Sequence, residues 1–225
     1  MTNQIENPVY YRQAASLQFG PILITLTVII AFWNWYFNTV DSQWLIDNML
    51  HIQVMTDDLG TEEQKILSSI LTIDFLKFST LLGAIGSLVI SLLILSAYVV
   101  LVSRFVLPQG QEVGFTTAIN VSSVSSLMTA SIHLLYGIYV WLAQESKVNL
   151  YEVDFLSLNN ALLGLSPEHV LFGFANSISI ATLLFIVCCG HLMSKKSSFT
   201  FQQATILYLV PYAAIWGFLL INAVI

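Results

Sequence analysis

The chain has 225 residues, of which 56% are hydrophobic and 9% are charged, and its formal net charge is −6 at pH 7. Soluble domains carry about 25% charged residues, so this composition and a mean hydropathy of +0.79 exclude an ordinary soluble domain and predict an all-α, polytopic membrane protein. The negative charge argues against a nucleic-acid partner. Cys188 and Cys189 are adjacent within an apolar run, which is typical of small buried residues rather than of a redox or lipidation site.

The N-terminal part predicts the first membrane span. Residues 1–18 are polar with aromatic interruptions, and we expect a cytoplasmic segment at the membrane surface. Residues 19–37 are uncharged and longer than the apolar region of a signal peptide, which is about 7–15 residues. No small-residue cleavage site follows them. We therefore expect a helix that stays in the mature protein, with Pro21 in its first turn, where the missing N–H costs nothing.

Residues 38–77 form the longest predicted segment outside the membrane. Within this external loop we expect two short amphipathic helices that lie on the outer membrane surface. Thr61 and Gln64 have the spacing of a capping box, which places the start of the second helix. An apolar stripe follows on one face of that helix: Ile66, Leu67, Ile70 and Leu71.

Residues 78–103 predict the second span, flanked by Lys77 and Arg104. Asp74 precedes Lys77 by three residues and indicates an interfacial ion pair rather than an ion pathway, because an acid at the bilayer centre costs about 2.5–3.5 kcal/mol. Small residues recur every four positions in this span, a pattern that lets helix backbones approach closely. These candidate packing residues are Ser79, Gly83, Ser87 and Ser91.

The third predicted span, residues 117–142, carries polar side chains on one face at i, i+4, i+7 and i+11. They are Ser122, Ser126, Thr129 and His133, and we call them the polar seam. Such a seam must turn away from lipid, so this helix is expected inside a bundle. Histidine is a residue type that can relay protons or bind a metal. No second histidine lies four residues from His133, so we expect it to hydrogen-bond a neighbouring helix instead.

An acidic, leucine-rich loop covers residues 143–165 and leads to the fourth predicted span. Ser166, Pro167 and Glu168 have the composition of a helix start, with an N-cap, a proline at the first helical position and an acid near the positive end of the helix dipole. The fourth span is therefore predicted over residues 169–193.

The fifth predicted span covers residues 204–225 and completes one transmembrane domain over residues 19–225. Thr200 and Gln203 have capping-box spacing before it. Pro211 lies inside it and predicts a kink.

The positive-inside rule orients five spans, whose two ends must lie on opposite sides. A cytoplasmic N-terminus and an external C-terminus place more basic residues in the shorter cytoplasmic segments, Arg12, Arg104, Lys195 and Lys196, than in the external ones, Lys65, Lys77 and Lys147. The candidate contacts to anionic lipid headgroups are Arg104, Lys195 and Lys196.

The second half of the chain contains several short segments that together resemble the sequence pattern of a known protein family. They are GFTTA at 114–118, NSISIATLLF at 176–185, Gly190 with His191, KKSS at 195–198, and Ala204. Over residues 103–225 these segments resemble the Yip family of Ypt/Rab-interacting membrane proteins, in its bacterial branch. The chain departs from the family pattern near the start of the fourth span, where an acid and a tryptophan are common and where Asn176 and Ala181 stand here.

The resemblance implies a multi-pass protein of the bacterial inner membrane, without a cofactor, that acts in membrane organisation or trafficking. Eukaryotic members of the family are associated with Rab-type GTPases and carry a long cytoplasmic N-terminal region. Only about 18 residues precede the first predicted span here, so we do not expect GTPase binding.

Other candidate chemistry is weaker. The paired Glu62 and Glu63 are similar to the glutamates of CAAX-type membrane proteases, but no arginine accompanies them in the predicted helix, and we do not expect an enzyme. Acids in the external segments are of the type that binds a divalent cation, yet their spacing defines no coordination sphere, and we expect a solvated face. These acids are Asp57, Asp58, Glu62, Glu63, Glu145, Glu152, Asp154 and Glu168.

Two functional hypotheses follow. The favoured one is a non-enzymatic scaffold or adaptor that acts through membrane lipids, a protein partner or a second copy of the chain. The alternative is a small transporter or channel, in which the polar seam faces Asn176, Ser179 and Tyr208 across a cavity around His133. No charged residue lies in the cores of the predicted spans, which favours packing over ion transport.

Overall fold

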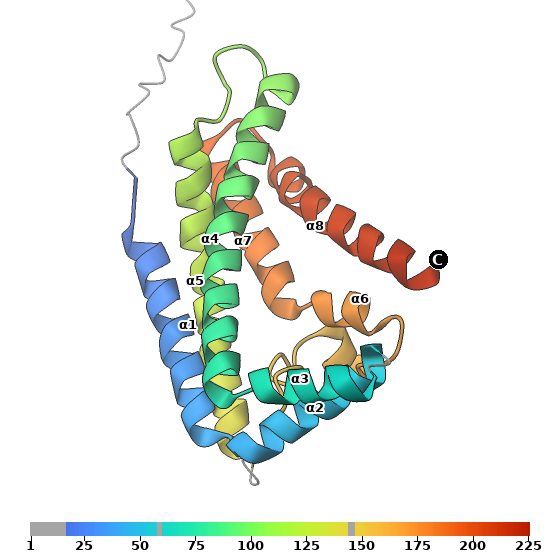
Figure 1. Cartoon of the computed structure of the whole chain (residues 1–225). Coiled ribbons are helices and arrows are strands. Elements are labelled where there is room, and N and C mark those ends of the chain that lie inside the picture. Colours follow the sequence, from blue (N-terminus) through green and yellow to red (C-terminus); the bar gives the residue numbers. More distant parts are fainter. Residues whose placement is uncertain (1–16, 58–59, 144–146) are drawn as a thin grey trace, which may run out of the picture.

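A computed structural model describes residues 17–57, 60–143 and 147–225 (Figure 1). Most of the predicted segment 1–18 lies outside these residues, as do Asp58 and Glu145. The described part contains no strand, only one isolated bridge between Ser157 and Ser179, so the all-helical prediction is confirmed. Its helices are α1 (Gly20–Thr39), α2 (Ser42–Asp57), α3 (Thr61–Ile70), α4 (Ile73–Val106), α5 (Phe115–Leu142), the π-helical turn η1 (Asn159–Leu163), α6 (Phe172–Ser177), α7 (Ile180–Lys196) and α8 (Phe201–Val224).

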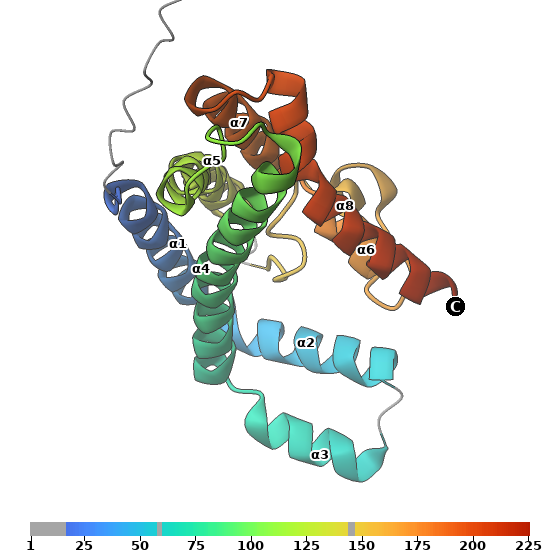
Figure 2. The same cartoon turned by 90° about the horizontal axis from the view of Figure 1, so that it is seen from above.

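Four described helices are long and apolar enough to cross a membrane: α1, α4, α5 and α8. They correspond to the first, second, third and fifth predicted spans and place the protein in a membrane. α7 has 17 residues, whereas a helix that crosses the hydrocarbon core needs about 20. α2 and α3 lie side by side at one end of the bundle and extend away from it (Figures 1 and 2).

The prediction of one continuous helix over residues 169–193 is wrong. The chain turns at residues 166–171, α6 begins only at Phe172, and the helix breaks at Ile178 before α7 begins. Ser166 bonds to Glu168 with its side chain (3.1 Å) instead of capping a helix. The break is stable because a neighbouring segment takes over its backbone hydrogen bonds: Leu158 N–H donates to the Ile178 carbonyl at 2.7 Å, and Ile180 N–H donates to the Leu156 carbonyl at 3.2 Å.

One of the two predicted capping boxes is confirmed. Gln203 N–H donates to Thr200 Oγ1 at 3.3 Å, and Thr200 N–H donates to Gln203 Oε1 at 2.9 Å. The box predicted at Thr61 and Gln64 is wrong, because the N-cap is Gly60. Glu63 accepts from the N–H of Gly60 at 2.9 Å, and glycine has no side chain to return the bond. A carboxylate is the stronger acceptor at the positive end of a helix dipole.

α5 lies at the centre of the bundle, between α1, α4 and α7 (Figure 2). Its two ends belong to two hydrophobic clusters. Val121 packs in one with residues of α4, α7 and α8, including the fully buried Met193 and Tyr208. Tyr136 packs in the other with Tyr36 of α1 and with the loop that follows α5.

α7 and α8 pack tightly against one another at Gly190. A Cβ atom added there would clash with Thr205 Oγ1 and would lie 2.9 Å from Thr205 Cα. The adjacent Ala204 is completely buried. Gly190 and Ala204 are two of the residues that carry the family resemblance. A larger side chain at either position would not fit where α7 and α8 cross.

We expect Gly190→Ala to lower the thermal unfolding midpoint of the protein in mild detergent, because overpacking costs about 1–3 kcal/mol. Gly86→Ala is the matched control, since a Cβ at Gly86 meets no atom within 4 Å. Thr205→Ala should restore part of the loss by removing the nearest atom. A Gly190→Ala protein as stable as the Gly86→Ala protein would contradict this crossing geometry.

Candidate functional site

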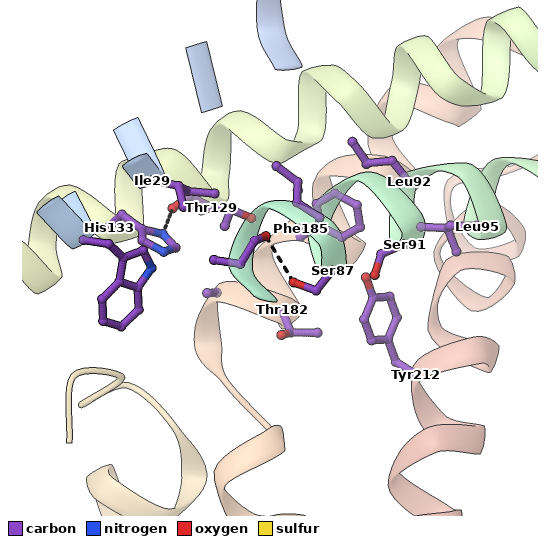
Figure 3. Close-up of a pocket in the computed structure, with 14 residues that line it drawn as sticks. Ile29, Ser87, Ser91, Leu92, Leu95, Thr129, His133, Thr182, Phe185 and Tyr212 are labelled. Atoms are coloured by element: carbon purple, nitrogen blue, oxygen red, sulfur yellow. Dashed lines mark hydrogen bonds between the residues drawn. The ribbon is translucent and has the colours of Figure 1, made fainter. Parts of the chain in front are cut away.

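A half-open cavity of about 340 Å³ lies beside His133 (Figure 3). Five helices contribute its wall: α1, α4, α5, α7 and α8. The apolar part of the wall includes Ile29, Leu92, Leu95 and Phe185, and no charged residue lines the cavity. Its polar lining residues are Ser87, Ser91, Thr129, His133, Thr182 and Tyr212.

The orientation of His133 is fixed on one side of its ring. Nδ1 lies 2.8 Å from the carbonyl oxygen of Thr129, and because a carbonyl only accepts, Nδ1 carries the proton. The ring packs edge-on against Phe32, with centroids 5.5 Å apart, and against Tyr136 at 5.4 Å. The donor role of Nδ1 leaves Nε2 as the acceptor of the neutral imidazole.

The polar seam divides into two halves with different surroundings. Ser122 and Ser126 are fully buried, and Ser126 hydrogen-bonds to Thr25 of α1 at 3.0 Å. Thr129 and His133 instead line the cavity. One half of the seam thus packs helices together, and the other half presents polar groups to an open space.

The structure does not bring Asn176 and Ser179 to the seam. Ser179 is buried at the start of α7, where its hydroxyl accepts from Ala181 N–H at 3.2 Å. Asn176 lines a separate pocket of about 390 Å³ with Tyr151 and Phe172. Tyr208 is fully buried in the cluster of α4, α5, α7 and α8.

Asp154 links three elements, although the sequence suggested a solvated acid. Its Oδ1 accepts from the hydroxyl of Tyr136 in α5 at 2.5 Å and from the hydroxyl of Ser179 at 3.2 Å. Asn160 donates to the carbonyl of Asp154 at 2.9 Å. The expectation of a solvated face is therefore wrong for Asp154, whose carboxylate ties the loop after α5 to α5 itself, through Tyr136, and to the start of α7, through Ser179. The one sequence signal was the pair of asparagines, 159 and 160, in a leucine-rich loop, since buried amides need partners.

The small-residue stripe of α4 lies on the outside of the described structure. Ser79, Gly83, Ser87 and Ser91 are all exposed. The buried face of α4 is a different one, formed by Leu92, Leu95, Ser96, Val99 and Ser103. The stripe thus packs no helix of the described chain along its length, and its second half, Ser87 and Ser91, lines the cavity.

The basic residues predicted to contact headgroups lie at one end of the bundle. Arg104 is in the last turn of α4, and Lys195 and Lys196 are in the last turn of α7. All three are exposed, and the two helix ends lie at the same end of the structure (Figure 1).

Among the described residues, no group of three or more His, Cys, Asp or Glu side chains is placed to hold a metal ion. Comparison of the chain with protein-family models, with curated proteins and with solved structures gives no match.

We expect Asp154→Ala to destabilise the protein by about 1–3 kcal/mol, because the Tyr136 and Ser179 hydroxyls lose their acceptor. Thermal unfolding in detergent measures this loss of stability. Glu62→Ala is the control, because the Glu62–Lys65 ion pair is solvent-exposed and such pairs contribute about 0–1 kcal/mol. The double variant Asp154→Ala/Tyr136→Phe should lose less than the sum of the two single losses. Strictly additive losses would show that the Asp154–Tyr136 contact does not form.

Proposed function

We propose that this chain is a multi-pass membrane protein of the Yip type that acts without catalysis, as a scaffold or adaptor for protein or lipid partners inside the bilayer. The proposal places the partner at the face between α4 and α8, which includes the cavity at His133.

The divergence of α8 carries this proposal. The first half of α8 packs on α7 through Ala204, Leu207 and Tyr208, and its second half leaves the bundle (Figure 1). Trp216 braces this second half by donating to the carbonyl of Ser177 at 3.3 Å. The large apolar side chains after Pro211 are mostly exposed, among them Ile215, Phe218, Leu220, Ile221 and Val224.

A membrane helix held away from its neighbours offers surface to a lateral partner. Association inside lipid depends on close van der Waals contact rather than on the exclusion of water, and α4 presents its small-residue stripe nearby. This combination is the physical support for a partner in the bilayer.

The topology in this proposal has five crossings, with α6 and α7 together forming the fourth. The basic turns of α4 and α7 then lie on the cytoplasmic side of a bacterial inner membrane, in keeping with the positive-inside rule. The N-terminus is cytoplasmic and the C-terminus external. α2 and α3 lie at the outer surface, where the exposed Ile66 and Ile70 of α3 enter the interface.

A small transporter for a neutral solute is the second candidate, favoured by the cavity that Thr129 and His133 line. Ser122 and Ser126 count against it, because both are fully buried and Ser126 is bonded to α1. The polar seam therefore offers no continuous polar surface along α5.

A photoreactive amino acid at Phe218 tests the proposed face in intact membranes. We expect a discrete adduct with one protein, a second copy included, or with one lipid class. The same amino acid at Leu134 of α5 is the control, since Leu134 is similarly exposed, at 61% against 66% for Phe218.

Two results together would contradict the scaffold proposal. One is that the adducts at Phe218 are no more discrete than those at Leu134, and the other is that the protein is a monomer without a partner in mild detergent.

A further inference from the structure

We propose that the cavity at His133 binds a neutral, hydroxyl-bearing lipid of the monoacylglycerol class, with its chain on the apolar wall and its uncharged head at His133. The inference rests on the proposed function, since it names the lipid partner of that same face.

The polar groups of the cavity wall select a ligand that both donates and accepts hydrogen bonds. Nε2 of His133 is an acceptor, and within the described structure it has no hydrogen-bond partner. The hydroxyls of Thr129 and Thr182 likewise bond to no other described residue. Trp33, also on the wall, has a buried indole N–H with no partner in the described chain, a group that calls for an acceptor. A glycerol head with hydroxyls and an ester carbonyl supplies both kinds of group.

The charge of the wall excludes an ionised head. No lysine, arginine, aspartate or glutamate lines the cavity. A phosphate head brought there would lose its hydration without gaining a cation. Asp154 is bound by Tyr136 and Ser179 and lies outside the lining.

The size of the cavity suits a small molecule. The cavity offers about 340 Å³, which is near the lower end of the range for small-molecule pockets, about 300–1,000 Å³. One chain segment and a small head therefore fit, and the rest of the lipid stays in the bilayer.

The surroundings of the cavity give access from the lipid phase. α8 diverges from α4 beside it (Figure 1), and Ser91 of α4 and Tyr212 of α8 point toward one another across it (Figure 3). Large apolar residues near this side are exposed on both helices, among them Ile90 and Ile94 of α4 and Ile215 of α8. In a bilayer these side chains contact acyl chains, so a lipid enters sideways without crossing water.

The test uses the full chain in lipid nanodiscs with two photoreactive probes that share one acyl chain, a monoacylglycerol and a lysophosphatidic acid. We expect the neutral probe to label the protein about fivefold more than the anionic probe, which corresponds to one hydrogen bond of ordinary strength. The labelled peptides should come from the wall of the cavity. Equal labelling by the two probes, or no labelling, overturns the inference.

Two serine variants locate the site. Ser87→Phe fills the cavity and should abolish the preference for the neutral probe. Ser131→Phe is the matched control: Ser131 is also exposed, also bonds to a carbonyl of its own helix (3.0 Å, against 3.1 Å for Ser87), and does not line the cavity. Wild-type labelling of Ser87→Phe, or an equal loss in Ser131→Phe, overturns the assignment.

Thr182→Val removes a hydroxyl at nearly constant volume and tests the head contact if Ser87→Phe fails to fold. We expect it to reduce the preference about fivefold, and an unchanged preference overturns the head contact. The two proposals can fail separately. If the photoreactive amino acid at Phe218 still forms a partner adduct but the monoacylglycerol probe does not label the protein, the lipid inference is wrong and the scaffold proposal stands.

Discussion

The structure depends on one constraint: backbone N–H and C=O groups that a helix break releases inside the protein must find partners there. The break between α6 and α7 would violate it if the chain simply unwound at Ile178. Instead, the segment around Leu156 and Leu158 pairs with both sides of the break, and Asp154 holds the adjoining hydroxyls of Tyr136 and Ser179. This pairing fixes where α7 begins, and the first turn of α7 supplies Thr182 to the cavity wall. The hydrogen bonds that stabilise the break thus help to position the α7 wall of the cavity.

Polar residues in the bundle have two roles that depend on what faces them. Ser126 is buried, and its hydroxyl hydrogen-bonds both to Thr25 of α1 and to a carbonyl of its own helix. It therefore holds α1 against α5. His133, two turns further along the same face, meets the space left by the divergence of α8. The same helical periodicity therefore produces a packing contact at Ser126 and part of a cavity wall at His133.

Local patterns in the sequence predicted what local interactions determine. Apolar runs gave the long helices α1, α4, α5 and α8, and Thr200 with Gln203 gave the cap of α8. The break at Ile178 was not predictable, because the residues that stabilise it lie about 20 positions earlier in an apparently irregular loop. The role of Asp154 was missed for the same reason. The outward orientation of the small-residue stripe of α4 could not be predicted either, because it depends on which face of α4 the neighbouring helices cover. The spacing of small residues predicts close packing but does not say which helix packs there. Of the candidate site, His133 and Thr129 were predicted, whereas Thr182 and Tyr212 enter it only through the tertiary arrangement.

A density map of the whole protein in native-like lipid, at a resolution that shows ordered lipid, tests both the arrangement of α8 and the lipid site. We expect α8 held apart from α4, a close-packed and dry contact at Ser122 and Ser126, and elongated non-protein density in the cavity whose polar end meets His133. A closed contact between α8 and α4 that eliminates the cavity, or ordered water running from His133 to Ser122, would contradict this expectation.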